Sequence, residues 1–217
     1  MRRSLAERLV DYSAELTGFG IVTGMEDLKY IPFPIAVSQL EGKTREIQFG
    51  MPSEPLVGAL LRTLVASKPG GRILELGTGT GIATAWLLEG MDAHSHLISV
   101  DNNGAVQRVG AEILGRDKRL ELVTDDGAKF LQRQLPQSFD LVFADAIPGK
   151  YEALDDALAV VKVGGFYMID DMVPQANWPD GHAEKVPVLI ETLSAHPDFT
   201  VLPLVWASGI VVAVRKR

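Results

Sequence analysis

The stretch that decides the fold is Arg72-Ile-Leu-Glu-Leu-Gly-Thr-Gly-Thr-Gly-Ile-Ala-Thr-Ala-Trp86, in which an apolar run enters a glycine cluster and then a helical pattern. The short apolar run around Glu75 is typical of a buried parallel strand. Gly77, Gly79 and Gly81 allow a sharp turn and a close approach between a ligand and the backbone. The helix that follows would point its free amide groups and positive dipole end at that ligand.

The spacing of these glycines distinguishes between ligands. A dinucleotide fingerprint, G-x-G-x-x-G, would need a third glycine at the position of Ile82, and no Gly-Lys-Ser or Gly-Lys-Thr of a P-loop follows. The stretch Glu75-Leu-Gly-Thr-Gly-Thr-Gly81 instead resembles the first motif of the class I S-adenosylmethionine-dependent methyltransferases. A tight turn without any ligand is the alternative interpretation.

Length and composition exclude several classes of protein. The 217 residues suit one α/β domain, 47% of them are hydrophobic, and a net charge of −7 argues against a broad nucleic-acid-binding face. The absence of cysteine excludes disulfides and Cys-ligated zinc. The start of the chain lacks the apolar stretch of a signal peptide, and no apolar run reaches membrane-spanning length. We therefore expect a cytoplasmic enzyme that acts on a small molecule and binds neither nucleic acid nor membrane.

From Arg72 onward, strand and helix patterns alternate, which predicts an α/β fold whose parallel sheet carries helices on both faces. The turn Ala207-Ser-Gly209 predicts that the last two strands form an antiparallel hairpin. A seven-stranded, mostly parallel, Rossmann-like sheet with such a closing hairpin is similar to the methyltransferase fold. We expect strands at residues 73–76, 97–101, 120–123, 141–144, 166–169, 200–204 and 210–214, and helices after Gly81, Asn103, Gly127, Tyr151 and His182.

The segment before the glycine motif is less regular. We expect a first helix from Ser4 and then, to residue 50, an irregular lid or dimer-contact segment with one short strand at Ile35-Ala-Val37. Ser53 is predicted to cap a helix that follows it. Residues 1–50 thus form an N-terminal helix and contact segment, residues 51–217 form the S-adenosylmethionine-binding domain, and a homodimer is expected.

Acidic residues follow the second and third strands, where ligands of open α/β sheets bind. Asp101 lies 26 residues after Glu75 and can accept both hydroxyls of a ribose, while Asp126 can accept the amine of an adenine. Each could instead cap the helix that follows it. The resemblance implies a cofactor-binding set of Glu75, Gly77, Thr78, Gly79, Thr80, Gly81, Asp101, Asn102, Asp126, Gly127, Ala128 and Asp145.

Three more carboxylates follow the fourth and fifth strands. Asp145, Asp170 and Asp171 would lie close together, and their mutual repulsion favours a hard divalent cation such as Mg²⁺. The arrangement is similar to the divalent-metal-dependent O-methyltransferases that act on catechols and caffeoyl esters, which have Asp-Asn where this chain has Asp170-Asp171. A metal that binds the acceptor hydroxyl would lower its pKa and orient it toward the methyl group. In the alternative, the carboxylates shape a pocket without a metal.

One departure from that family concerns the general base. Those enzymes carry a lysine three residues after the fourth-strand Asp, and this chain has Pro148 there, although Tyr151 keeps its register. Asp145 and Lys150 are therefore our candidate catalytic residues. Trp178 is predicted to be an aromatic platform of the substrate pocket or a surface-packing aromatic, and His182 is expected to cap or solvate a helix start.

These patterns together predict an O-methyltransferase that moves a methyl group from S-adenosylmethionine to a small, aromatic hydroxyl compound with the help of a divalent cation. A metal-independent small-molecule methyltransferase is the first alternative. A non-catalytic S-adenosylmethionine-binding module is the second.

Overall fold

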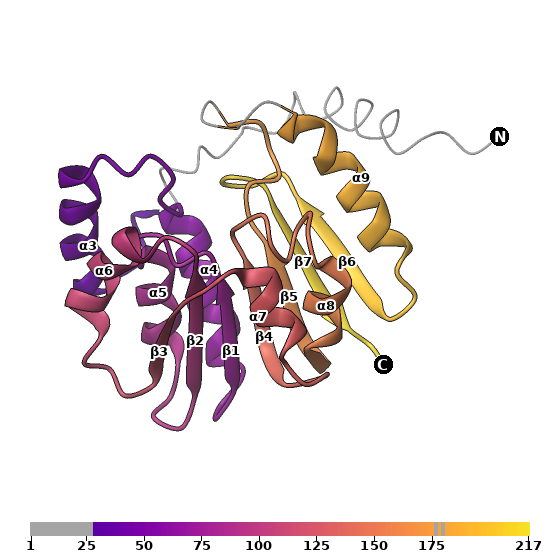
Figure 1. Cartoon of the computed structure of the whole chain (residues 1–217), viewed down its shortest axis with the longest axis horizontal. Coiled ribbons are helices and arrows are strands. Elements are labelled where there is room, and N and C mark those ends of the chain that lie inside the picture. Colours follow the sequence, from indigo (N-terminus) through magenta and orange to yellow (C-terminus); the bar gives the residue numbers. More distant parts are fainter. Residues whose placement is uncertain (1–27, 176–177, 179–180) are drawn as a thin grey trace. The chain divides into compact units, whose positions relative to one another are not determined.

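The computed structural model describes residues 28–175, 178 and 181–217 (Figure 1). The helix expected from Ser4 lies outside these residues. The chain divides into two units, residues 1–31 and 32–217, and all elements discussed below belong to the second.

The second unit is built on a seven-stranded sheet with the strand order β3-β2-β1-β4-β5-β7-β6. The strands β1 to β5 are parallel to one another, whereas β7 runs antiparallel to both β5 and β6. This confirms the predicted mixed sheet with its closing hairpin. The strands are β1 (Arg72–Leu76), β2 (His96–Asp101), β3 (Leu120–Thr124), β4 (Phe139–Ala144), β5 (Val161–Ile169), β6 (Phe199–Leu204) and β7 (Ile210–Arg215).

The strand order reverses between β1 and β4, which creates a crevice at their carboxyl ends. From β1 the chain proceeds outward to β2 and β3, then returns to β4 and continues to β5 in the other direction. Because such crossovers are right-handed, the connecting helices on the two sides of the reversal cover opposite faces of the sheet. The glycine cluster after β1 and the acid after β4 therefore meet at one edge of the sheet.

The helices after β1 follow the expected order, and Figure 1 shows the helices of this unit around the sheet. α3 packs against α5 and α6, α4 packs against α5, and α7 packs against α8. The helices are α3 (Ile35–Glu46), α4 (Pro55–Ala66), α5 (Ile82–Gly90), α6 (Gly104–Leu114), α7 (Gly127–Gln132), α8 (Leu154–Ala159) and α9 (His182–Ala195). In the described part of the chain, none of them has the length and apolar character needed to span a membrane.

Two predictions before the glycine motif were wrong. The strand expected at Ile35-Ala-Val37 is the first turn of helix α3, in which Val37, Leu40 and Thr44 share one buried face. Pro34 precedes this helix and fixes the backbone angle at its start, a place where proline costs no hydrogen bond. Ser53 does not cap helix α4, because the cap position belongs to Glu54 and the hydroxyl of Ser53 bonds elsewhere.

Apolar burial holds the two faces of the sheet to their helices. The central strand β4 is the most enclosed, since Leu141, Val142, Phe143 and Ala144 are all fully buried. Complete burial of such side chains is worth about 1.5 to 3 kcal/mol each. The carboxyl end of β4, where the candidate site begins, is thus anchored in the best-packed part of the molecule.

Candidate active site

A cavity of about 410 Å³ opens at the carboxyl ends of β1, β2 and β4. This volume is in the range of small-molecule and cofactor sites. It is lined by the glycine turn, the ends of β2 and β4, and residues from three more distant segments. The lining includes Phe49, Met51, Ser53, Gly77, Thr78, Gly79, Thr80, Asp101, Asn102, Gly127, Asp145, Lys150, Asp171, Trp178 and His182.

The backbone conformation and the packing of the chain account for each glycine of the turn. All three adopt positive φ angles, at 100° for Gly77, 52° for Gly79 and 92° for Gly81. A Cβ on Gly77 would lie 2.5 Å from the carbonyl oxygen of Asp145. Gly79 faces the ring of Phe49, and a Cβ on Gly81 would lie 3.0 Å from the Cα of Gly110. Gly77 and Gly79 line the cavity, whereas Gly81 starts helix α5 and packs against α6.

The two threonines of the turn hold it in place through hydrogen bonds to neighbouring elements. Thr78 shares a hydrogen bond of 2.6 Å with Ser99 and accepts a second from the amide of Gln107 at 3.0 Å. Thr80 accepts a hydrogen bond from the hydroxyl of Thr44 at 2.7 Å, which ties the turn to helix α3. The turn is therefore held in shape by hydrogen bonds from three other elements.

Glu75 does not reach the cavity. It is fully buried under the turn, where Oε2 accepts hydrogen bonds from Thr84 and Ser99 and Oε1 has no partner. Burial raises the pKa of this carboxyl group to about 7, against the two hydroxyl hydrogen bonds, which lower it. Glu75 thus joins β1 to α5 and β2, and its expected role at the methionine end of a cofactor stays a prediction.

The acids after β2 and β3 differ in position. Asp101 lines the cavity, where Oδ2 accepts from the amide of Gly79 at 2.8 Å and Oδ1 accepts from the amide of Asn103 at 2.7 Å. Asp126 caps helix α7 by accepting from the amide of Lys129, so the capping alternative describes its contacts. Neither Asp126 nor Ala128 is part of the cavity lining, although Gly127 between them is.

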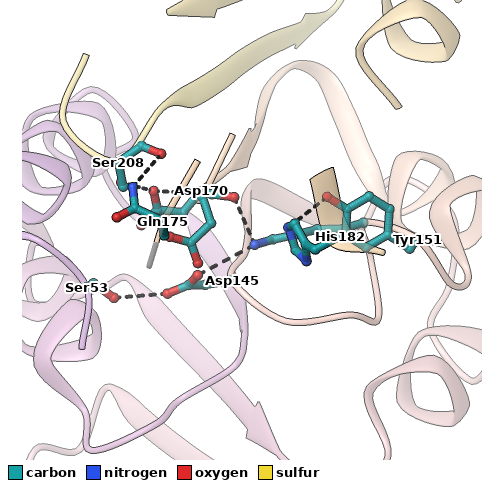
Figure 2. A network of polar contacts seen from close by, with 9 residues as sticks. Ser53, Asp145, Tyr151, Asp170, Gln175, His182 and Ser208 are labelled. Atoms are coloured by element: carbon teal, nitrogen blue, oxygen red, sulfur yellow. Dashed lines mark hydrogen bonds and ion pairs between the residues drawn. The ribbon is translucent and has the colours of Figure 1, made fainter. Parts of the chain in front are cut away.

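The acid after β4 lies beside a buried lysine. Oδ2 of Asp145 accepts a hydrogen bond of 3.0 Å from Ser53, and Oδ1 lies 3.7 Å from the ammonium of Lys150 (Figure 2). Burial and the neighbouring Asp170 raise the pKa of Asp145 well above its usual value, and Lys150 opposes this. Lys150 also donates a hydrogen bond of 2.9 Å to the carbonyl oxygen of Asp170.

The two acids after β5 lie in different environments. Asp170 is almost fully buried and accepts hydrogen bonds from the hydroxyl of Ser208 and the amide of Asp171 (Figure 2). Burial raises the pKa of Asp170 to about 6, while the Ser208 hydrogen bond lowers it. Asp171 has a positive φ of 61° and lines the cavity. Ser208 reaches this site from the turn between β6 and β7.

The residues expected to hold a divalent metal do not fit one in this arrangement. Among the described residues, no group of three or more His, Cys, Asp or Glu side chains is arranged to hold a metal ion. Oδ2 of Asp145 accepts from Ser53, Oδ1 of Asp145 faces the ammonium of Lys150, and Oδ1 of Asp170 accepts from Ser208. A hard cation such as Mg²⁺ at these carboxylates would lie beside the ammonium of Lys150, whose charge repels it.

An aromatic cluster forms another part of the wall. The hydroxyl of Tyr151 and Nε2 of His182 are 3.1 Å apart (Figure 2). The rings of Trp178 and His182 lie 4.4 Å apart. Burial, together with the charge of Lys150, lowers the pKa of His182. His182 is buried and not the solvated helix start that we expected. Trp178 lines the cavity, and its indole Nε1 is buried without a partner.

Sequence reasoning missed several residues that line or support the site. Phe49 and Met51 come from the segment after α3, Ser53 from the start of α4, and Ser208 from the last hairpin. None belongs to a motif, and each is brought to the site by tertiary packing. The serines carried a weak signal, because small polar residues at element ends often bond to nearby acids.

Comparisons with known proteins agree with this geometry. Residues 74–172 match the model of a methyltransferase domain. A Mycobacteroides abscessus protein whose name proposes an O-methyltransferase is 27% identical over 188 residues, which cover 80% of this chain and 86% of that protein. A Mycobacterium leprae protein named in the same way is 35% identical over 98 residues. That second alignment spans 43% of this chain and 44% of the relative, less than half of each.

Solved structures share the fold. The O-methyltransferase from Bacillus cereus in complex with S-adenosylhomocysteine has a TM-score of 0.73 at 22% identity, covering 86% of this chain and 93% of that one. The O-methyltransferase TomG from Streptomyces achromogenes, in complex with S-adenosylmethionine, also has a TM-score of 0.73 at 22% identity, covering 87% and 92%. At these identities the likeness shows the fold. The glycine turn, the strand order and the family match together identify residues 74–172 as a methyltransferase domain.

Proposed function

We propose that this chain transfers a methyl group from S-adenosylmethionine to a hydroxyl oxygen of a small aromatic compound. One observation carries the proposal: a single cavity joins the glycine turn and Asp101 to Asp145, Lys150 and the aromatic wall. The first part suits a nucleoside-containing methyl donor, and the second suits an acceptor with an apolar ring and a polar oxygen. The methyltransferase-domain match over residues 74–172 and the O-methyltransferase names of the relatives support the same reaction.

In this proposal the cofactor half of the cavity is made by residues that are already fixed. S-adenosylmethionine supplies an activated methyl group on a sulfonium. The backbone of Gly77 to Gly79 allows it to approach closely, and the helix that begins at Ile82 contributes its positive dipole end. Asp101 accepts one backbone hydrogen bond on each oxygen, and the remaining lone pairs of its carboxylate are available for ribose hydroxyls.

In the acceptor half, Asp145 accepts the proton of the reacting hydroxyl and Lys150 stabilises the oxygen that forms. Holding both partners in one cavity converts an encounter of two molecules into a positioned reaction. Trp178 and His182 provide flat faces against which an aromatic acceptor can pack. The reacting oxygen would thus face the buried acids while its ring contacts the aromatic wall.

Calorimetry with S-adenosylhomocysteine tests the cofactor half without any knowledge of the acceptor. We expect one molecule bound per chain, with no added metal. A panel of phenols, catechols, aliphatic alcohols and amines, offered with S-adenosylmethionine, then tests the acceptor half through formation of S-adenosylhomocysteine. We expect turnover with the aromatic hydroxyl compounds, and turnover confined to amines would contradict the proposal.

Trp178→Ala tests the aromatic wall, and Trp206→Ala, on the turn after β6, is the matched control. The first variant should raise the KM of an aromatic acceptor about fivefold, the effect of roughly 1 kcal/mol of lost ring contact. It should leave the affinity for S-adenosylhomocysteine unchanged. An equal KM in both variants would remove the support for an aromatic acceptor.

A further inference from the structure

Lys150 places a positive charge in the acidic corner of the cavity, which we define as Asp145, Asp170 and Asp171. The side chain of Lys150 is only 4% exposed. Its ammonium lies 3.7 Å from Oδ1 of Asp145 and donates to the carbonyl oxygen of Asp170 at 2.9 Å. Among the described residues that line the cavity, it is the only lysine or arginine.

Neutral donors reach Oδ2 of Asp145 and Oδ1 of Asp170. Ser53 donates to the second oxygen of Asp145, while Ser208 and the amide of Asp171 donate to Asp170. The two serines come from the segment before α4 and from the last hairpin, so distant parts of the chain converge on the carboxylates. A divalent ion among the same oxygens would lie close to the ammonium of Lys150, and the two positive charges would repel each other.

We propose that the ammonium of Lys150 takes the place of the divalent cation, so that this site works without a metal. This inference rests on the proposed methyl transfer to oxygen. An ammonium has three N–H donors, and one is given to the carbonyl of Asp170. The other two can serve the carboxylate of Asp145 and the oxygen of the acceptor. Lys150 is then an electrostatic partner of that oxygen.

An ammonium in place of a divalent cation changes which acceptors the site can use. A metal site selects acceptors that chelate it through two adjacent hydroxyls. A lysine ammonium is a compact point charge that needs a single oxygen partner. The site should therefore accept an aromatic compound with one hydroxyl as readily as a catechol, with no requirement for a vicinal diol.

Binding of Mn²⁺, followed by electron paramagnetic resonance, tests the inference without any acceptor or turnover. The wild-type chain should not bind a stoichiometric Mn²⁺ at this site. Lys150→Met removes the charge while keeping an unbranched side chain, and should bind Mn²⁺ at least roughly tenfold more tightly because the acids lose their counter-charge. Lys150→Arg retains the charge and should behave as the wild type. Lys162→Met, which removes the partner of Asp140 at the far end of β4, is the matched control and should also behave as the wild type.

Equal Mn²⁺ affinity in the wild type and Lys150→Met would overturn the inference, and so would a wild-type site for Mn²⁺ that Asp170→Asn abolishes. Thermal unfolding of each variant establishes that the folded chain is being compared. Calorimetry with S-adenosylhomocysteine on the same samples keeps the two proposals apart. Failure to bind the nucleoside rejects the proposed function, whereas the Mn²⁺ result alone decides the role of Lys150.

Discussion

Lys150 and Asp145 form an ion pair in which the ammonium lies 3.7 Å from Oδ1 and the two side chains are 4% and 13% exposed. Two charges in such a place are costly unless they compensate each other. The pair joins the end of β4 to the segment before α8, and it lies where the methyl acceptor is proposed to bind. Its integrity therefore matters both for folding and for the reaction.

Removal of the ammonium should destabilise the fold. Loss of one partner from a buried pair leaves an uncompensated charge, so Lys150→Met should lower the free energy of unfolding by about 3 kcal/mol at pH 8. Urea denaturation measures this. The double variant Lys150→Met/Asp145→Asn should regain part of the loss, and a double variant less stable than Lys150→Met alone would show that the two charges do not compensate each other.

Glu75 should make stability depend on pH. Its pKa is raised from 4.5 to about 7 in the folded chain, so the folded state binds more protons than the unfolded state between these values. Stability from this group is fully present below pH 4.5 and is lost as the pH rises to about 7. The difference corresponds to about 3 kcal/mol. Glu75→Gln, which resembles the protonated acid, should flatten the curve of unfolding free energy in this window, and an unchanged slope would contradict the assignment.

Gly77 should tolerate no side chain. A Cβ there would approach the carbonyl oxygen of Asp145 to 2.5 Å at a φ of 100°, so Gly77→Ala should cost about 3 kcal/mol or more in unfolding free energy. Gly70 is the matched control, because it has a φ of 66° and open space around it. Gly70→Ala should cost only about 1 kcal/mol, from the backbone angle alone. Equal losses in the two variants would mean that the contact with Asp145 is unimportant.

Asp101 should control the affinity for the nucleoside. Asp101→Asn leaves one acceptor oxygen and removes the charge, so binding of S-adenosylhomocysteine should weaken about tenfold to a hundredfold, the loss of a hydrogen bond to a charged group. Calorimetry compares it with Asp155→Asn, an exposed acid in the first turn of α8. An effect of the same size in the control would point to a general loss of charge.

The sheet and its crevice were predictable because local patterns carry them. The apolar runs, the acids that end them and the glycines after β1 are all contiguous in sequence, and the alternation with helices fixes the topology. Asp101, Asp145 and Asp171 were expected at this edge of the sheet and line the cavity there. The glycine turn was also placed correctly. Its glycines are required in part because other segments of the chain pack closely against them, which the sequence does not reveal.

The remaining features depend on packing between distant segments. Helix α3 was missed because Pro32 and Pro34 indicated an irregular segment, while the face formed by Val37 and Leu40 finds its partners only in the folded chain. Asp170 was expected to face a metal, and the hydroxyl of Ser208, 38 residues away, engages it instead. His182 and Tyr151 are 31 residues apart in the sequence, so no local pattern predicted that they would bury each other.

A crystal structure grown with S-adenosylhomocysteine and Mn²⁺, with anomalous scattering recorded for manganese, would distinguish a lysine site from a metal site. We expect the nucleoside across the glycine turn with its ribose at Asp101, the ammonium of Lys150 between Asp145 and Asp170, and no anomalous peak among the three acids. A manganese peak bound by Asp145 and Asp170, with Lys150 displaced, would contradict this expectation, as would a nucleoside bound away from the turn.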